Sequence, residues 1–417
     1  MRAAVYRGPN DLRTETVPVP KIGRHELLVK VATCGVCPTD IKKIQHGTVL
    51  PPRIFGHETA GTIVQIGGNN SKLETPNSKL SLGDRVALHH HVPCMGCHYC
   101  RHHAFAQCAQ YKRTGITAGF EPAGGGFAEY VRIMPFVLGG VVKIPAKNTF
   151  EEGAMLEPVN TVLKAINRLN LLPGDNVLVA GQGPIGLMFT RLLQLRGINV
   201  LATDLLDSRL KLAKQLGARW AVKPNEAARV NLSKRAAKIP NPKLETQNSK
   251  LVMDAAILAV PSDAALHQAF GLVRGAGQIL LFAHTKRPQV QSPRSKVQSP
   301  AFTTHAGAIS PSPLRSGGAG RGEEALRAQG ESTHSALRTP HSALYPTDLS
   351  TICVDEKDLL GSYSADFTLQ REVARLVFTR QLDVRKLITH RFPLEQTTQA
   401  VNLAAHPTPE SLKILVG

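Results

Sequence analysis

The sequence predicts an α/β protein in which a barrel-like antiparallel domain precedes a doubly wound parallel sheet. The chain has 417 residues, of which 42% are apolar, so it can bury the cores of two domains. Short β-branched runs bounded by glycine occur early, at 26–33 (ELLVKVAT) and 61–66, which is typical of antiparallel strands. After Pro158 the pattern changes to alternating strands and helices, which favours a parallel sheet.

The second half supplies the alternating elements in order. Strands are expected at 176–180 (NVLVA), 199–203 (NVLAT), 251–256 and 278–283, with helices at 185–196 and 208–216.

Three stretches interrupt this pattern. Residues 70–80 (NSKLETPNSKL) and 241–251 (NPKLETQNSKL) are nearly the same peptide at two unrelated places. The third stretch, roughly 286–345, is rich in Ser, Pro, Gly and Arg and lacks aspartate. Such a composition cannot build a core, so we expect a disordered or loosely ordered loop there. A nucleic-acid-binding arm is the less favoured alternative.

The charge balance is strongly basic. Lys and Arg number 50 against 31 Asp and Glu, a formal net charge of +19. A polyanionic partner or a basic solvated surface would each explain it. The charge is scattered and lacks an aromatic-interleaved stripe, which favours the surface and makes nucleic acid an unexpected partner. Residues 1–10 hold no apolar run, and no stretch reaches membrane-spanning length, so we expect a soluble, cytoplasmic protein.

Four of the seven cysteines form a C-x2-C-x2-C-x7-C set, made of Cys94, Cys97, Cys100 and Cys108. Four thiolates at such spacing close a tetrahedral site, which suits a structural zinc ion. An iron–sulfur cluster is a poorer match, because its usual bacterial run places the fourth cysteine three residues after the third. Two disulfides would need an oxidising compartment, which nothing in the sequence indicates.

A dinucleotide site is predicted where the strand at 176–180 meets the next helix. The motif G-x-G-x-x-G there contains Gly181, Gly183, Pro184, Ile185 and Gly186. Asp204 ends the following strand, where a carboxylate accepts the ribose hydroxyls and repels a 2′-phosphate, so NAD is preferred over NADP. Arg209 is a further cofactor-binding candidate. The alternative is that the glycines mark only a tight turn and Asp204 caps the helix near Ser208.

Two further metal-binding side chains are ambiguous by themselves. Cys37 could pair with Cys34 as a redox C-x-x-C, and His57 could be an ordinary loop histidine. The run 89–91 (HHH) suggests another metal site, but consecutive strand positions alternate faces, so the three rings cannot all reach one ion. We expect those histidines to be structural or cleft-lining.

Taken together, the motifs resemble those of zinc-dependent medium-chain alcohol dehydrogenases, and most closely the sorbitol, polyol and threonine dehydrogenase branch. The resemblance rests on Cys37-x-Thr39-Asp40, Gly56-His57-Glu58-x-x-Gly61-x5-Gly67, the four cysteines, Glu157-Pro158 and the dinucleotide motif, in that order. It implies a GroES-like β-barrel catalytic domain at 1–158 and 365–417. It also implies a Rossmann cofactor domain at 159–364, with the insertion at about 286–345.

The resemblance also assigns roles to individual positions. Cys37, His57 and Glu157 match the ligands of a catalytic zinc, and Glu58 matches a carboxylate that either ligates or stands just behind the metal. Asp40 would orient His57. The remaining matches are Thr39 with the hydroxyl that receives the substrate proton, Thr161 with a residue beside the nicotinamide, and Lys42 with a position often occupied by a relay histidine.

The implied activity is hydride transfer between NAD and a secondary alcohol or polyol, with threonine or an aminocyclitol also open as substrate. Two zinc ions per chain, one catalytic and one structural, and a homodimer or homotetramer are implied as well. The alternative is a catalytically silent, zinc-containing protein whose basic surface binds RNA or another polyanion.

Overall fold

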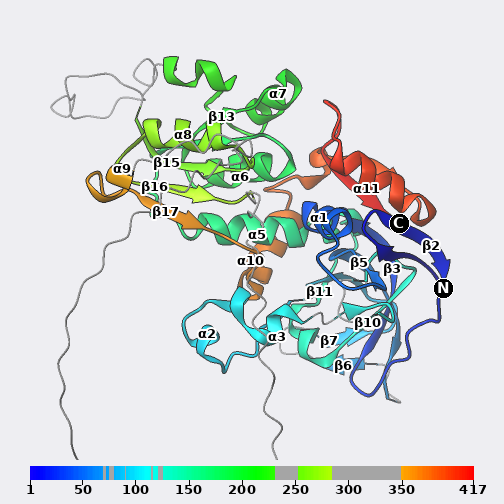
Figure 1. The fold of residues 1–417 in the computed structure, drawn as a ribbon. Coiled ribbons are helices and arrows are strands. Elements are labelled where there is room, and N and C mark those ends of the chain that lie inside the picture. The colour runs from blue at the N-terminus through cyan, green and yellow to red at the C-terminus, as the bar shows by residue number, and fades with distance from the viewer. Residues whose placement is uncertain are drawn as a thin grey trace, which may run out of the picture. The chain divides into compact units, whose positions relative to one another are not determined.

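The computed structural model describes residues 1–68, 72–74, 79–89, 91–113, 116–120, 125–230, 252–283 and 349–417 (Figure 1). The described residues belong to one compact unit. The repeat at 241–251 and the predicted loop at 286–345 lie outside them, as does part of the repeat at 70–80. None of the helices in these ranges is both long enough and apolar enough to cross a membrane.

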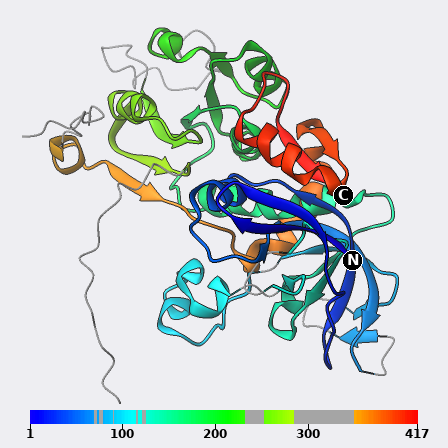
Figure 2. The same ribbon diagram turned by 45° about the vertical axis from the view of Figure 1, so that its right-hand side comes forward.

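The predicted antiparallel part is an eight-stranded sheet with a smaller sheet beside it. The main path runs β11 (Val142–Lys143), β8 (Arg85–Leu88), β5 (Glu58–Ile66), β3 (Leu27–Gly35), β10 (Tyr130–Ile133) and β9 (Ile116–Thr117). The late strands β18 (Ile388–Phe392) and β19 (Lys413–Val416) join it through β3. The smaller sheet has the order β2 (Asp11–Thr16), β1 (Arg2–Gly8), β4 (Arg53–Ile54), and β6 (Lys72–Glu74) pairs with β7 (Lys79–Ser81). Figure 2 shows the red C-terminal segment against the blue N-terminal one.

The helices that pack with these sheets come from the first 166 residues and from the last part of the chain. They are α1 (Pro38–His46), α2 (His98–Arg101), α3 (Ala109–Lys112), α4 (Phe150–Ala154), α5 (Leu156–Ile166), α10 (Gln370–Phe378) and α11 (Thr397–Ala405).

The second half forms a six-stranded parallel sheet. Its order is β14 (Trp220–Val222), β13 (Asn199–Thr203), β12 (Asn176–Ala180), β15 (Met253–Leu258), β16 (Val273–Leu281) and β17 (Asp358–Gly361). The accompanying helices are α6 (Pro184–Leu195), α7 (Asp207–Gln215), α8 (Asp263–Leu272) and α9 (Leu349–Cys353). The chain builds outward from β12 to β14 and then returns to β15 on the other side. This reversal creates a switch point beyond the carboxyl end of β12, where nucleotides bind in such sheets.

The boundaries of β12 and β13 are those predicted. The other two expected strands are shifted: β15 begins at Met253 rather than at 251, and β16 already begins at Val273.

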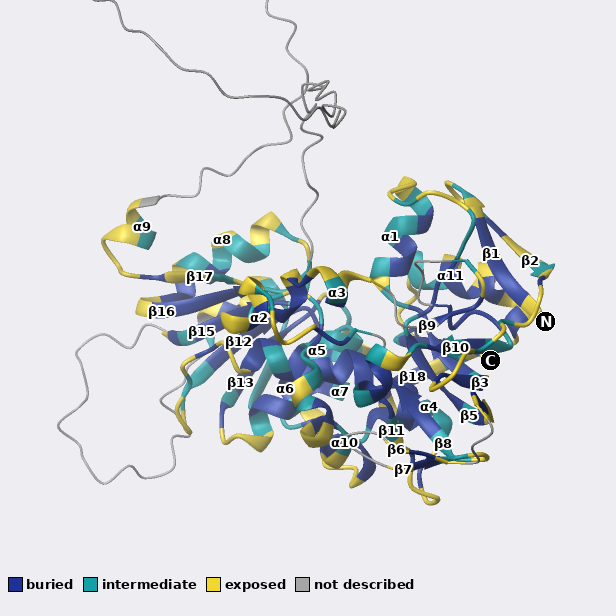
Figure 3. Cartoon of the chain, turned by 90° about the horizontal axis from the view of Figure 1, so that it is seen from below, coloured by how far each residue is buried: buried dark blue, intermediate teal, exposed yellow. Residues whose placement is uncertain are grey.

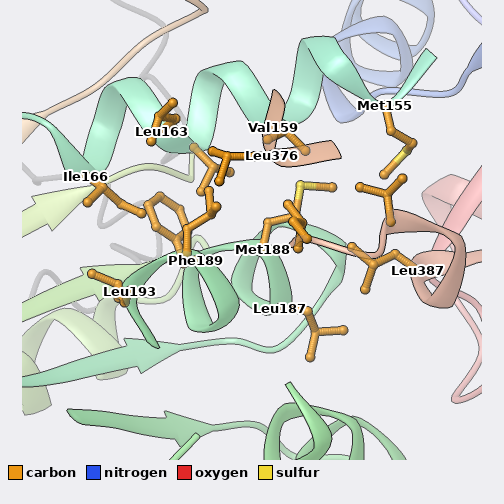
Figure 4. Close-up of a cluster of buried hydrophobic side chains, with 14 of the residues drawn as sticks. Met155, Val159, Leu163, Ile166, Leu187, Met188, Phe189, Leu193, Leu376 and Leu387 are labelled. Atoms are coloured by element: carbon orange, nitrogen blue, oxygen red, sulfur yellow. The ribbon is translucent and has the colours of Figure 1, made fainter. Parts of the chain in front are cut away.

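One core connects the two sheets through α5. Met155, directly before this helix, and Val159 and Leu163 within it belong to one cluster with Met188 and Phe189 of α6 (Figure 4). The same cluster includes Ala60 of β5, Ala87 of β8 and Val177 of β12. Figure 3 shows the buried residues concentrated in the strands and on the inner faces of the covering helices. Because well-packed cores resist rearrangement, α5 holds a fixed position relative to both sheets.

Candidate functional site

The four cysteines of the predicted structural site converge. Their sulfur atoms lie within 4.8 Å of one another, with 3.5 Å between Cys97 and Cys100 and 3.6 Å between Cys108 and Cys94. A tetrahedral zinc ion with Zn–S bonds of about 2.3 Å separates its sulfurs by roughly 3.8 Å. The donor set and its spacing therefore fit zinc, and all seven cysteines are free thiols rather than disulfides.

Local backbone groups prepare the Cys108 thiol for metal binding. Burial opposes ionisation of Cys108, but backbone N–H groups of Cys94 and Tyr111 lower the pKa of its thiol to about 6. Cys94 N–H lies 3.4 Å from the Cys108 sulfur. A thiol with such a pKa is a thiolate at neutral pH, which is the form that binds metal.

A second group joins Cys37, His57 and Glu58, whose ligand atoms lie within 4.8 Å of one another. Cys37 is the N-cap of α1, His57 ends the loop before β5, and Glu58 is the first residue of that strand. Strands β3 and β5 pair with Gly35 opposite Glu58, which brings the two segments together. One thiol, one imidazole and one carboxylate make a donor set that suits a catalytic zinc ion.

Glycine at position 35 is what allows this approach. A Cβ atom there would lie 1.9 Å from Oε2 of Glu58, so any other residue would displace the carboxylate. Gly56, just before His57, has φ +94°, a left-handed conformation that glycine adopts without strain. Glycine is therefore required at 35 for close approach to Glu58, and it is favoured at 56 by the backbone conformation.

Asp40 holds the ring of His57. His57 Nδ1 donates to Oδ1 of Asp40 at 3.1 Å, because a carboxylate can only accept, and Asp40 is 1% exposed. Burial opposes the charge on Asp40, but the neighbouring His57 keeps the pKa of the carboxyl below its ordinary value. Because Asp40 holds Nδ1, Nε2 is the ring nitrogen that would bind a metal ion together with Cys37.

Lys413 enters the same site from β19. Its ammonium forms an ion pair with Glu58 and donates to the carbonyl of Val36 at 3.0 Å. Burial disfavours the charged lysine, but Glu58 and Cys37 raise its pKa above the ordinary value. The sequence interpretation missed this residue, although a lysine inside the apolar run LKILV was a signal that it pairs with a buried acid.

Glu157 is the second carboxylate beside the metal group. It lies on α5, is 7% exposed, and is not among the three residues whose ligand atoms converge. Burial raises the pKa of its carboxyl to about 7; His57 opposes this shift and Glu58 adds to it. Within the described residues no hydrogen bond or ion pair satisfies it, whereas Glu58 has Lys413.

Thr39, Lys42 and Thr161 lie on helices that carry the site. Thr39 is half-buried in the first turn of α1, between Cys37 and Asp40. Lys42 is one turn further along, where burial lowers the pKa of its ammonium and Cys37 opposes that shift. Thr161 donates to the carbonyl of Pro158 at 2.8 Å and shares a face of α5 with Glu157, four residues before it.

The predicted dinucleotide motif forms a tight loop between β12 and α6. Gly181 has φ +90°, and its N–H donates to the Thr203 carbonyl at 2.8 Å. A Cβ on Gly186 would lie 1.7 Å from the Gly181 carbonyl oxygen, so this glycine lets helix and strand pack closely. A Cβ on Gly183 would meet no atom within 4 Å. Pro184 and Ile185 begin α6, whose N-terminus therefore presents free N–H groups beside Gly183.

Asp204 lies directly after β13, next to this loop. Its carboxylate accepts from the N–H of Gln182 at 2.7 Å and from the N–H of Leu206 at 3.0 Å. Arg209 approaches it with 3.8 Å between Nη1 and Oδ2, and also donates to the carbonyl of Ser411 at 3.5 Å. Asp204 thus fixes the turn before α7 and stands beside the glycine loop. It does not cap the helix as the alternative held, because the N-cap of α7 is Leu206, which has no side-chain cap.

Comparisons with known proteins agree with this arrangement. Residues 23–146 match the alcohol dehydrogenase GroES-like domain, and residues 184–312 match the zinc-binding dehydrogenase family. The chain is 33% identical to sorbitol dehydrogenase of Bombyx mori over 222 residues, which cover 52% of this chain and 60% of that protein. It is 30% identical to sorbitol dehydrogenase of Bos taurus over 272 residues, covering 63% of this chain and 72% of the relative.

A solved structure shows the same fold. An alcohol dehydrogenase from Thermotoga maritima superposes with a TM-score of 0.73 at 19% identity, covering 100% of this chain and 98% of that one. The fold is thus a GroES-like domain with a Rossmann domain, as the sequence predicted. With the matching domains, the relatives and the two metal-type constellations in place, the chain belongs to the zinc-dependent alcohol and polyol dehydrogenases of the medium-chain dehydrogenase/reductase family.

Proposed function

We propose that this protein transfers a hydride between a secondary alcohol or polyol and NAD, with one catalytic and one structural zinc ion per chain. The observation that carries the proposal is the convergence of Cys37, His57 and Glu58 beside the buried Glu157. The helix that carries Glu157 packs against the helix that follows the glycine loop (Figure 4). A metal site and a nucleotide site would thereby be held by neighbouring helices.

We assign Cys37, His57 and Glu157 as the ligands of the catalytic zinc, with Glu58 standing behind them. The support is the unequal pairing of the carboxylates, because Lys413 already balances the charge of Glu58, whereas Glu157 has no described partner. Bound there, Zn²⁺ would supply Lewis acidity to the substrate oxygen.

The protein's own groups then have separate tasks. Asp40 keeps His57 in the tautomer that presents Nε2. Thr39, two residues after Cys37 in the first turn of α1, would accept the proton that leaves the substrate hydroxyl. Thr161, on the same face of α5 as Glu157, would contact the nicotinamide.

NAD rather than NADP is the proposed cofactor. Asp204 is 8% exposed, and two backbone N–H groups fix its carboxylate in place. The fixed negative charge would repel the 2′-phosphate of NADP. Among the described residues, the cation that pairs with Asp204 is Arg209, which also donates a hydrogen bond to the carbonyl of Ser411.

The proposed domain division is 1–158 and 365–417 for catalysis and 159–364 for the cofactor, with α5 crossing the boundary.

We also propose a homodimer or homotetramer. Strand β17 is an edge of the parallel sheet, with Leu359 41% and the following Tyr363 50% exposed. The thiolate sites need a reducing compartment, which supports a cytoplasmic location.

Elemental analysis on wild type and Cys37→Ser, followed by assay of an alcohol panel with NAD, tests the function. About two zinc ions per wild-type chain and about one in the variant are expected, with NAD-dependent oxidation only in the wild type. One zinc in both proteins and no turnover would contradict the proposal. Salt-dependent RNA retention in that case would favour the silent binding protein instead.

A further inference from the structure

His89 occupies a position next to the metal group that the proposed mechanism does not use. It follows directly after β8, which pairs with β5 so that Leu88 lies opposite Thr59. Continuing this antiparallel register by one residue places His89 opposite Glu58. Residues opposite each other in an antiparallel pair project to the same face, with Cβ atoms about 5 Å apart. His89 therefore lies on the ligand side of the sheet.

The imidazole of His89 is buried without satisfying its polar atoms. The residue is 2% exposed, and neither Nδ1 nor Nε2 has a hydrogen-bond partner among the residues that the structure describes. The backbone of His91 lies beside the ring and opposes the lowering of its pKa that burial causes. Buried polar groups in native proteins are nearly always paired, so an imidazole in this state is suited to hydrogen-bonding a bound ligand.

The chain leaves His89 little freedom to turn away. A Cβ on Gly140 would lie 2.5 Å from the His89 carbonyl oxygen and 3.0 Å from its Cβ, so that segment closes directly over the residue. Nearby, the ring of His91 stacks on Tyr111, with 4.8 Å between centroids and 18° between planes. Tyr111 is itself fixed, because its hydroxyl donates to the Ala365 carbonyl at 2.6 Å.

The charge state of the ring limits what it can bind. Burial lowers the pKa of His89 to about 4, so at neutral pH it is an uncharged imidazole with one N–H donor and one acceptor nitrogen. A hydroxyl group both donates and accepts, and so can use either nitrogen. A carboxylate offers no donor and an ammonium offers no acceptor, so each could use only one.

We propose that His89 is a specificity-determining residue that hydrogen-bonds a second hydroxyl of the substrate, close to the carbon that is oxidised. The inference rests on the proposed function and narrows its substrate class to alcohols with neighbouring hydroxyls. A substrate with only one hydroxyl would leave the imidazole unsatisfied, and sites built in this way discriminate strongly against the analogue that lacks the group.

The test compares two alcohols that differ by one hydroxyl, butane-2,3-diol and butan-2-ol, with zinc-loaded protein and NAD. Wild type should prefer the diol in kcat/KM. His89→Leu should lower that preference by about tenfold or more, and His89→Gln, which keeps a donor and an acceptor, should retain part of it. His406→Leu, an exposed histidine after α11, is the matched control and should behave as wild type. An unchanged preference in His89→Leu would overturn the proposal.

Thermal unfolding without substrate gives a readout that does not depend on turnover. Leucine needs no hydrogen bond, so His89→Leu should raise Tm by a few degrees, whereas a structural histidine would give a lower Tm. Failure of wild type to oxidise either alcohol would count against the proposed function rather than against His89. In that case the thermal measurement decides, because a higher Tm supports the inference and a lower one overturns it.

Discussion

Lys413 and Glu58 form an ion pair inside the proposed metal site, with side chains only 6% and 2% exposed. The lysine also donates to the carbonyl of Val36, so it ties β19 to the segment that carries Cys37. Glu58 thus has a counter-charge supplied by the protein itself. In the proposed site, Glu58 would support the ligands, and the neighbouring Glu157 would be the carboxylate that binds the cation.

Removing the lysine should destabilise the fold strongly. Lys413→Met leaves Glu58 as a buried, uncompensated charge, for which we expect a loss of about 3–5 kcal/mol in the free energy of unfolding. Urea denaturation at pH 7 measures it. The double variant Lys413→Met/Glu58→Gln should recover much of the loss. Lys143→Met, which breaks an exposed pair with Asp84, should cost under about 1 kcal/mol. Equal losses in Lys413→Met and Lys143→Met would contradict this account.

The two carboxylates should differ in zinc binding. Glu157→Gln should reduce bound zinc from about two ions per chain to about one, because it removes a ligand, whereas Glu58→Gln should still hold about two. Elemental analysis after exhaustive dialysis gives the comparison. If Glu58→Gln loses the ion and Glu157→Gln keeps it, the two roles are reversed.

The cysteine site should support stability rather than turnover. Cys100→Ser removes one of four ligands around a small cluster formed with Phe105 and Tyr111, so one zinc ion and several degrees of Tm should be lost. Cys37→Ser should lose the other ion with a smaller change in Tm. Calorimetry and metal analysis on both variants check this, and identical Tm losses would argue against the division of roles.

Cofactor choice should depend on Asp204. Asp204→Ser removes the charge that repels a 2′-phosphate, so the ratio of NADP to NAD affinity should rise by about tenfold or more. Fluorescence titration with both reduced cofactors measures the ratio. Asp207→Ser is the control, since that carboxylate is 81% exposed and paired with Lys223. A ratio unchanged in Asp204→Ser would show that another residue selects the cofactor.

Acid should weaken one specific contact. Glu152 accepts from the N–H of Thr149, from Asn148 and from Arg380. Burial opposes its charge, but Arg380 and the other donors hold its pKa below the ordinary value. A carboxyl with a depressed folded pKa stabilises the protein above the unfolded pKa, about 4.3, and this stability is lost as the pH falls through the folded value.

Glu152→Gln should therefore lower the free energy of unfolding by about 1–2 kcal/mol at pH 7, a modest amount because Arg380 is 38% exposed and screened. The difference from wild type should shrink below about pH 4. Urea denaturation at several pH values would show it, and a difference that grows in acid would be inconsistent with the sign of the shift.

Local sequence was enough to place some elements and not others. The runs at 176–180 and 199–203 were predicted with the observed bounds, because polar residues or glycine flank each apolar stretch. Strand β16 was expected to begin after the glycines of RGAGQ, at 278, yet it begins at Val273. Pairing with β15, from Met253 onward, extends the strand through those glycines. Tertiary pairing overrode the local signal for a break.

The site shows the same division. The family resemblance, rather than the spacing alone, predicted that Cys37, His57 and Glu157 share a site with Glu58 beside them. The structure brings the ligand atoms of Cys37, His57 and Glu58 together. The sequence pattern could not indicate that Lys413 reaches Glu58, because that contact depends on β19 pairing with β3 across most of the chain. Nor could it indicate that His89 is buried with unsatisfied nitrogens, since both properties exist only in the folded protein.

The late strand β19 also sets the order in which the molecule can be assembled. During synthesis on the ribosome, the segments with Cys37, His57 and Glu157 emerge long before Lys413, so the acids at the metal site have no lysine partner until then. The hydrogen bond from Arg209 to the carbonyl of Ser411 likewise forms only after the end of the chain has been made. The ion pair between Lys413 and Glu58 can therefore form only at the end of synthesis, when β19 pairs with β3.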